Sequence, residues 1–405
     1  MDAYGIFMEH GLIRSISTGL SQKGVRDHNE RLLLSLLQRN GPMPGSDLSR
    51  LAELSPPTVS SILRRLEGEG ILERGEPVRG KVGKPSIPMR LASDGVFSFG
   101  FKIGRRSADL VLIDLNGKLR EERQLTYPTP ISEDILGFLG DGVRNITEGM
   151  DPAHAARICG IGIAAPFEMW NRPDKSMDLS AAFAPWVGID IRQEAQLRTG
   201  LPVSLLNDAT AACQAEHTYG RGKEFRDYAY FFIGAFIGGG IVLNNSVFEG
   251  RQGNAGALGS LPSIGPQGES MQLVDMASIH QLELRLREVD LDPQQLWSKP
   301  ESWHSLSRYV DPWLGQTAQE LAKAALSTCS VIDFEAILID GAFPASVRDD
   351  LVNRVRRYVV TQDTRGLIQP RIESGSIGRK ARAIGAATRP IGAQFMMQAS
   401  LGMTI

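Results

Sequence analysis

Residues 205–259 combine a carboxylate with two glycine-rich segments, at a spacing that suits ligand binding. Asn207 and Asp208 are expected at the end of a strand, directly before a helix that extends to Glu216. The apolar run 228–243, interrupted by four glycines, predicts a buried strand, a tight turn and a second strand. A carboxylate beside glycine-rich turns can bind a polyhydroxy or phosphorylated ligand. The alternative is a hairpin sheet whose glycines only make turns.

Two acidic residues of this stretch also have a structural interpretation. Asp208 could cap the helix that follows it, because a carboxylate accepts hydrogen bonds from the first backbone N–H groups of a helix. Glu216 is expected to form a surface or capping pair rather than to contact a ligand. The role of Asp208 is open at this point.

The charge of the chain is unevenly distributed. Its 405 residues carry a net charge of −2, which argues against a protein that coats nucleic acid with its whole surface. Residues 1–92 contain 13 Lys and Arg against 10 Asp and Glu, a balance of +3, so the remainder is near −5. A basic N-terminal part and an acidic body indicate that one end meets a polyanion.

Cysteine usage and hydropathy indicate a cytoplasmic protein without a membrane partner. Cys159, Cys213 and Cys329 lie far apart and lack metal-ligand spacing, so we expect buried free thiols in a reducing compartment. No stretch reaches the roughly 18–20 apolar residues of a membrane span, and the N-terminus lacks the pattern of a signal peptide.

The N-terminal part has the element order of a winged helix-turn-helix. A helix is predicted over 25–40, and a second, short helix soon after it. A third helix begins at Pro56 with Ser55 as its cap. Residues 71–91 then alternate and turn as a β-hairpin whose tip is rich in Gly, Arg and Lys. The buried face of the third helix is expected to consist of Val59, Ile62, Leu63 and Leu66.

Three helices followed by a basic hairpin predict binding to double-stranded DNA. In this fold the third helix enters the major groove, and the wing reaches phosphates or the minor groove. Short hydroxyl side chains allow close approach, and arginines can reach phosphates or guanine edges. A module used only for protein contacts is the alternative. The predicted DNA contacts are Thr58, Ser60, Ser61, Arg64 and Arg65 of the helix and Arg79, Lys81 and Lys84 of the wing.

After residue 92 the chain alternates between strands and helices. Residues 95–127 predict antiparallel strands, helices and further strands follow, and a similar succession begins again near residue 202. We therefore expect an α/β protein in which residues 1–92 form a winged helix-turn-helix DNA-binding domain with an N-terminal arm. Residues 93–405 are expected to form two similar lobes with a ligand cleft between them, and to mediate dimerisation.

The chain resembles the ROK family (repressors, open reading frames and sugar kinases), specifically its winged-helix repressor branch. The resemblance implies a two-lobed actin-like, ribonuclease H-like sugar-kinase fold, a homodimer or dimer of dimers, and DNA affinity that a carbohydrate-type effector alters. It also matches Asp208 to the family's catalytic base. The matching segments are RDHNERLLLSLL, LSPPTVSSILRRLEGEGILERGE, VGKP, ADLVLIDLNGKL, GIGIAAP, PVSLLNDATAACQAE, GNAGALG and LIDGAF.

Departures from the family pattern indicate that phosphoryl transfer is lost. The first phosphate loop carries a carboxylate in the family's kinases, whereas it reads FKIGRRS here, with Lys102, Arg105 and Arg106. The second loop reads GAFIGGG, with Ala235 in place of a threonine. Phosphoryl transfer needs an organised metal ion and donors aimed at the γ-phosphate. Asp208 is then a vestigial base that can still accept a hydrogen bond from a hydroxyl, and no cofactor is expected.

The sugar and zinc motifs of the family are also altered. Its Glu-x-Gly-His motif appears as Ala-Leu-Gly-Ser at 257–260, and its cysteine-rich zinc segment is replaced by IGPQGESMQLVDMAS. No metal is expected, since the thiolate ligands are missing. An anionic effector is the alternative to a sugar if a cation of the FKIGRRS segment faces the cleft. The remaining candidate effector contacts are Asn207, Asp208, Asn254 and the backbone of Gly256.

Together these features predict a transcriptional regulator that represses carbohydrate-related genes. Its expected partners are operator DNA, a small sugar-like effector and a second copy of the chain. Two alternatives stay open: a sugar kinase with a DNA-binding head, and a regulator that has no small-molecule effector.

Overall fold

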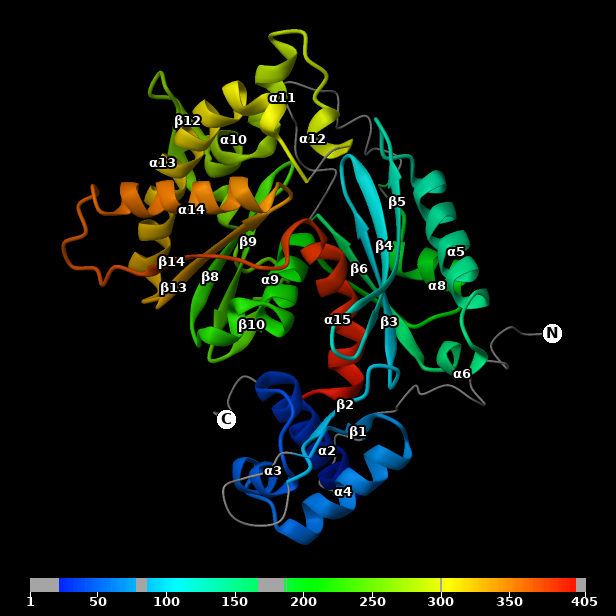
Figure 1. Ribbon diagram of the computed structural model, residues 1–405. Helices are drawn as coiled ribbons and strands as arrows, with labels where there is room; N and C mark the ends of the chain where they lie inside the picture. The colour runs from blue at the N-terminus through cyan, green and yellow to red at the C-terminus, as the bar shows by residue number, and fades with distance from the viewer. Residues whose placement is uncertain (1–21, 78–85, 167–185, 187, 299–300, 398–405) are drawn as a thin grey trace. The chain divides into compact units, whose positions relative to one another are not determined.

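The computed structural model divides into two compact units, Met1–Leu205 with Ala386–Ile405, and Leu206–Gly385. Each unit contains one five-stranded sheet, and the first unit also contains the N-terminal helices (Figure 1). The residues that the structure describes are 22–77, 86–166, 186, 188–298 and 301–397.

The N-terminal head has the predicted order of three helices and a hairpin. The two strands of the hairpin pair antiparallel, from Leu72 opposite Leu91 to Arg74 opposite Met89. Three predicted contacts at the tip of the wing, Arg79, Lys81 and Lys84, lie outside the described residues. The elements of the head are α2 (Gln22–Asn40), α3 (Gly45–Ala52), α4 (Pro56–Gly68), β1 (Leu72–Arg74) and β2 (Met89–Leu91).

The sheet of the first unit has the strand order β5-β4-β3-β6-β7. Strands β3, β4 and β5 are antiparallel neighbours, whereas β6 runs parallel to β3. Every residue of β3 and β6 is buried, as expected for central strands that are covered on both faces. Its strands are β3 (Phe97–Ile103), β4 (Ser107–Asp114), β5 (Leu119–Thr126), β6 (Ile158–Ala165) and β7 (Val203–Asn207), and its helices are α5 (Ser132–Glu148), α6 (Pro152–Ala155) and α8 (Ile191–Thr199).

The sheet of the second unit repeats this arrangement in the order β10-β9-β8-β13-β14. Its first three strands are antiparallel, and β13 runs parallel to β8 and to β14. The strands are β8 (Tyr228–Ile233), β9 (Ile237–Leu243), β10 (Ser246–Phe248), β13 (Ala336–Gly341) and β14 (Arg371–Ser374). The main helices are α9 (Asp208–Tyr219), α13 (Ser307–Val331) and α14 (Ala345–Val359).

Smaller elements complete the second unit. A two-stranded sheet occupies the segment that replaces the zinc motif of the family, so hydrogen bonds between strands hold this part of the chain. These elements are β11 (Pro262–Ile264), β12 (Ser270–Gln272), α10 (Leu273–Ala277), α11 (Ile279–Arg287), α12 (Gln295–Ser298) and the 3₁₀ turns η2 (Arg221–Glu224), η3 (Leu258–Ser260), η4 (His304–Leu306) and η5 (Gly378–Lys380).

The matching strand orders confirm the prediction of two similar α/β lobes. Each order places a three-stranded antiparallel meander beside a strand that runs parallel to the first strand of the meander. The cleft expected between the lobes and the domain boundary at residues 92/93 stay predictions.

The glycines of the GAFIGGG segment serve close packing more than turning. Gly234 lies in the turn between β8 and β9, but the other three lie within β9. A Cβ atom on Gly240 would lie 2.4 Å from the Cβ of Cys213 in α9, and one on Gly256 would lie 2.7 Å from the Cα of Gly240. Because neither side chain could be accommodated, α9 and the segment around residue 256 can lie against β9 at backbone distance. The interpretation of these glycines as turn residues alone was wrong.

Helix α15 (Ala381–Phe395) packs through glycines at close range. In the second unit, a Cβ on Gly385 would lie 1.6 Å from the carbonyl oxygen of Ala211 in α9. In the first unit, a Cβ on Gly162 of β6 would lie 1.8 Å from the carbonyl oxygen of Ala386. The helix is therefore seated against backbone at these two contacts.

The three cysteines are free and buried, as predicted. Burial raises the pKa of the Cys159 thiol to about 12 and that of the Cys329 thiol to about 11, so both are unreactive at neutral pH. None of the helices in the described ranges combines the length and hydropathy that crossing a membrane requires.

Two glycines of α15 provide a matched test of this packing. Gly385→Ala should destabilise the protein by about 1–3 kcal/mol, because the new methyl group collides with the backbone of Ala211. Gly392→Ala, where nothing lies within 4 Å of the added Cβ, should instead stabilise it by about 0.5–1 kcal/mol through helix propensity. Urea denaturation of both variants measures the difference. Equal midpoints for the two variants would contradict the packing described.

Candidate DNA-binding and effector sites

The residues at the start of α4 determine where this helix begins and which of its faces is exposed. Ser55 accepts a hydrogen bond from the backbone N–H of Thr58 at 3.4 Å, and Pro56 occupies the first helical position, as predicted. The predicted apolar face is buried, which leaves the small polar face outward. The exposed residues of that face are Thr58, Ser60, Ser61 and Arg64.

Two neighbouring arginines of α4 have different surroundings. Arg64 is exposed and donates to the hydroxyl of Ser60 at 3.3 Å, so its guanidinium lies beside the small polar residues. Arg65 forms an ion pair with Glu30 of α2, whose side chain is only 1% exposed. Arg65 therefore ties α4 to α2, which is a structural role that the sequence did not reveal. Its predicted contact with DNA is untested.

The candidate effector residues Asn207 and Asp208 have separate roles at the start of α9. The side-chain oxygen of Asn207 accepts hydrogen bonds from the backbone N–H groups of Ala209 and Thr210, at 2.9 and 3.3 Å. Asn207 is therefore the cap of this helix. Asp208 is the first helical residue, and the interpretation of Asp208 as the cap was wrong.

Asp208 is held in an ion pair with Arg382 of α15. The Nη1 atom of Arg382 lies 3.2 Å from Oδ2 of Asp208, and both side chains are largely buried, with exposed fractions of 12% and 19%. The guanidinium also lies 5.0 Å above the ring of Phe232, whereas its buried Nε donor has no hydrogen-bond partner. The pair thus has no net charge, and one buried donor of the guanidinium is left without a hydrogen-bond partner.

The other two candidate effector residues lie in the same part of the second unit. Gly256 adopts a φ of +73° and rests on the backbone of Gly240 in β9, and Asn254 precedes it by two residues. The same strand contacts the start of α9, since a Cβ on Gly238 would lie 2.8 Å from the Cβ of Ala209. Strand β9 therefore contacts both segments. Its Gly238 and Gly240 face α9, whereas Gly239 faces Leu258 on the opposite side of the sheet.

Lys102 does not face a ligand. Its side chain is 5% exposed, and Nζ donates to the carbonyl oxygen of Ser107 at 3.0 Å, to the hydroxyl of Ser107 at 2.8 Å and to Asp109 at 2.9 Å. An ammonium group has three donors, and these contacts use all of them. Lys102 therefore closes its own β3–β4 hairpin, and the alternative of an anionic effector would depend on Arg105 or Arg106. Arg106 donates to the carbonyl oxygen of Pro128 at 3.4 Å.

Glu216 has the capping role that the sequence favoured. Its fully buried carboxylate accepts from the backbone N–H groups of Arg221, Ser376 and Ile377 at 2.8–3.1 Å, and from the Ser376 hydroxyl at 3.0 Å. Because four donors surround it, the carboxylate is satisfied inside the fold. It fixes the loop that leads into α15.

Asp340 is a second buried carboxylate, and sequence reasoning did not identify its role. It accepts from the backbone N–H of Gly378 at 2.7 Å, and the hydroxyl of Tyr230 lies 3.4 Å away. Burial, reinforced by the negative charge of Glu216, raises the pKa of Asp340 to about 6, although Arg348 at 3.7 Å opposes this shift. Asp340 is the aspartate of the LIDGAF segment, but no nearby residue in the sequence indicates that its side chain is buried.

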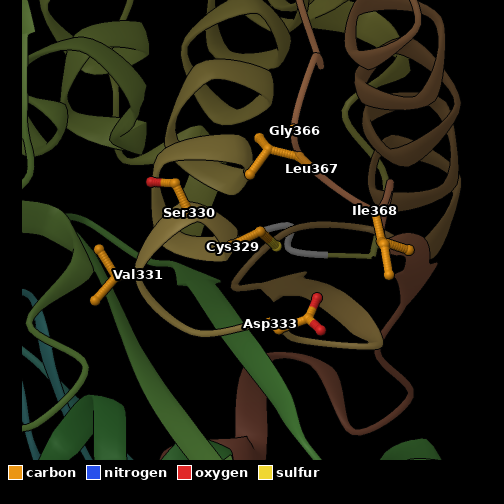
Figure 2. Close-up of a pocket in the computed structure, with 7 residues that line it drawn as sticks. All are labelled: Cys329, Ser330, Val331, Asp333, Gly366, Leu367 and Ile368. Carbon is orange, nitrogen blue, oxygen red and sulfur yellow. The ribbon is translucent and has the colours of Figure 1, made fainter.

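A shallow hollow lies at the end of α13, between the turn that follows this helix and the segment before β14. Figure 2 shows the carboxylate of Asp333 at this hollow, and Val331 and Ile368 are highly exposed, at 82% and 74%. Ser330 and Asp333 add polar groups to its lining, and Cys329 and Leu367 add apolar ones. Elsewhere in the described ranges, no three His, Cys, Asp or Glu side chains are grouped so that they could hold a metal ion.

Comparisons with known proteins agree with this architecture. Residues 98–271 match the model of the ROK family, and residues 26–73 match a model described as winged helix-turn-helix DNA-binding. The xylose repressor of Bacillus subtilis is 28% identical over 246 residues, which cover 59% of this chain and 62% of that protein. The matched part thus spans less than two thirds of this repressor.

Two solved structures share the fold. One is a ROK family transcriptional regulator described as a homolog of the Escherichia coli MLC protein. It has a TM-score of 0.64 and 21% identity, with 91% of this chain and 97% of that chain covered. The other is a ROK family glucokinase from Streptomyces griseus in complex with glucose and AMPPNP. Its TM-score is 0.54 at 21% identity, with 72% of this chain and 98% of that chain covered.

The raised pKa of Asp340 predicts an unusual pH dependence of stability. A folded-state pKa of about 6 against 3.8 means that the folded protein holds this proton more tightly than the unfolded chain. The resulting stabilisation is complete below about pH 4 and is lost as the pH rises through 6, with a total of about 3 kcal/mol. Asp340→Asn should therefore gain stability relative to the unsubstituted protein as the pH rises from 5 to 7.

Thermal melts at half-unit pH intervals measure this effect. Asp290→Asn, at an exposed carboxylate of the same unit, serves as the control and should follow the unsubstituted protein at every pH. If the Asp340→Asn curve stays parallel to that of the unsubstituted protein, the carboxyl group ionises at an ordinary pKa and the burial argument fails.

Proposed function

We propose that the protein is a transcriptional repressor of carbohydrate-related genes. The proposal starts from the match of residues 98–271 to the ROK family and of residues 26–73 to a winged helix-turn-helix. The observation that carries this proposal is the exposed face of α4. Its cap, its buried apolar side and its outward hydroxyls and Arg64 suit a helix that enters the major groove. We place the protein in the cytoplasm, where its DNA would be.

The ion pair of Asp208 and Arg382 supports a small, uncharged polyhydroxy effector. A sugar hydroxyl can donate to the carboxylate of Asp208, and once the ion pair opens a neighbouring sugar oxygen can accept from the guanidinium of Arg382. The pair has no net charge and so gives an anion no net attraction, and Lys102 is held inside its own hairpin. The B. subtilis relative is named for xylose, which has this chemistry. Asn207, Asn254 and Gly256 are proposed to complete the effector site.

The same contacts support a protein without kinase activity. Asp208 would act as a base in a kinase, but here its carboxylate is engaged in an ion pair with Arg382 at 3.2 Å. Where the resemblance places a carboxylate that organises metal, Lys102 forms an internal ion pair with Asp109. Phosphoryl transfer needs both functions, so a ROK sugar kinase is the less favoured function.

Residues 1–92 are proposed to bind DNA, and residues 93–405 to bind the effector and to form a dimer. A symmetric dimer presents two α4 helices to half-sites about one helical turn apart. The effector would act by preferring one arrangement of the body and so changing the spacing of these helices. A tenfold change in operator affinity requires a preference of about 1.4 kcal/mol.

Substitution of two adjacent arginines of α4 should distinguish an effect on DNA binding from an effect on stability. Arg64→Gln should weaken binding to the selected operator by about 1–3 kcal/mol and leave the thermal midpoint unchanged, since Arg64 is exposed. Arg65→Gln should lower the midpoint, because it removes the guanidinium that pairs with the buried Glu30 carboxylate, at a cost of up to about 3 kcal/mol. Fluorescence anisotropy with a genomic fragment selected by the full chain measures the first effect, and calorimetry the second. Unchanged affinity in Arg64→Gln would exclude the proposed recognition face.

Ligand binding at Asp208 can be tested by thermal shift. Among neutral sugars, polyols and sugar phosphates, a neutral sugar such as xylose should raise the midpoint, and Asp208→Asn should abolish the shift. Asp333→Asn, in the hollow of Figure 2, is the matched control and should keep it. No stabilisation by any compound would favour a regulator without an effector. Sugar-dependent ATP hydrolysis by the purified protein would instead establish the kinase.

A further inference from the structure

Helix α15 belongs to both units of the chain. Its first turn, Ala381–Gly385, is part of the second unit, and the remainder, from Ala386 to Phe395, is part of the first. A helix can carry a displacement of one end to the other through its backbone hydrogen bonds. In α15, Pro390 removes one of these hydrogen bonds, so the packing of the helix against its neighbours must help to carry the displacement. The contacts of each end of α15 within its own unit therefore determine which sites the helix can couple.

The first turn of α15 contacts the candidate effector site. Arg382 pairs with Asp208, the first residue of α9. Toward the other end of α9, the buried carboxylate of Glu216 holds Ser376 and Ile377, directly ahead of the helix. Of these anchors, only the Arg382 pair involves a group proposed to contact the effector, so it is the contact that a ligand can replace.

The last turn of α15 contacts the DNA-binding head within the first unit. Arg31 of α2 donates to the carbonyl oxygens of Ala393 and Gln394 at 3.2 and 3.4 Å. Ser35, one turn further along α2, accepts from the backbone N–H of Met397 at 2.9 Å. A guanidinium at the carbonyl end of a helix is favourable, because it satisfies open acceptors and the negative end of the helix dipole.

Helix α2 in turn holds the recognition helix. Glu30, the residue before Arg31, is the buried partner of Arg65 in α4. Three contacts therefore follow one another. Asp208 pairs with Arg382 at the start of α15, the end of α15 accepts from Arg31 of α2, and the neighbouring Glu30 pairs with Arg65 of α4. Every side-chain contact among them lies within a single unit.

We propose that α15 transmits effector binding to the DNA-binding head, and that Arg382 is the residue that senses the effector; this rests on the proposed effector site at Asp208. A ligand hydroxyl that donates to Asp208 competes for the oxygen that accepts from Arg382. The released guanidinium repositions the first turn of α15, and the shift reaches Arg31 and Ser35 at its carbonyl end. The effector acts because it prefers the arrangement in which the ion pair is open.

Breaking the ion pair should imitate the effector in its absence. Arg382→Gln in the full chain should weaken binding to the operator fragment at least tenfold without any sugar, and should reduce the further effect of added sugar to less than twofold. Arg354→Gln is the matched control, since Arg354 is a similarly buried arginine of the same unit that pairs with Asp311 and Asp350. It should bind the fragment like the unsubstituted protein.

A double-variant cycle tests whether the signal passes through α2. Arg31→Gln removes the contact at the far end of the helix, so adding Arg382→Gln to it should change operator affinity less than twofold. Effects of Arg382→Gln and Arg31→Gln that multiply independently would overturn the proposed route. Unchanged affinity in Arg382→Gln, or an equal loss in Arg354→Gln, would overturn the sensing role. If the unsubstituted protein selects no DNA fragment, the proposed function fails rather than the coupling.

Discussion

The ion pair between Asp208 and Arg382 is the interaction on which the interpretation of the second unit depends. A carboxylate at the start of a helix, next to a glycine-rich hairpin, is a useful base only if its charge is not already compensated. Here a largely buried guanidinium lies 3.2 Å away and rests on an aromatic ring. Removing either partner would leave a charge in a poorly solvated place, so the pair is held unless a ligand replaces it.

Sequence patterns predicted those features that arise within a few residues of each other. Ser55 and Pro56 begin α4 because a hydroxyl cap and a proline at the first turn act locally, and the apolar spacing that follows determines which face is buried. The repeated succession of strands likewise predicted two similar lobes, since alternating patterns report burial directly. The resemblance to a known family added the fold that joins these elements.

The contacts that decide chemistry could not be predicted in the same way. Arg382 lies 174 residues from Asp208, and nothing in the composition of α15 indicates that its first turn returns to α9. The cation of Lys102 was recognised as a departure from the family pattern, but its direction depends on Asp109 across the hairpin. The capping of α9 by Asn207 instead of Asp208 is a shift of one residue, which is within the ordinary uncertainty of helix boundaries.

A common principle connects the two altered positions. Lys102 lies where the resemblance places a metal-organising carboxylate, and Arg382 lies beside the residue that matches the base. Each cation pairs with a carboxylate of its own unit, so the charges that phosphate and metal would need are compensated inside the fold. Compensation of this kind preserves packing, because the strands and the close contacts of α9 and α15 do not depend on a bound ligand. The proposed effector is consistent with this pairing, because a hydroxyl group can exchange with an ion pair without adding net charge.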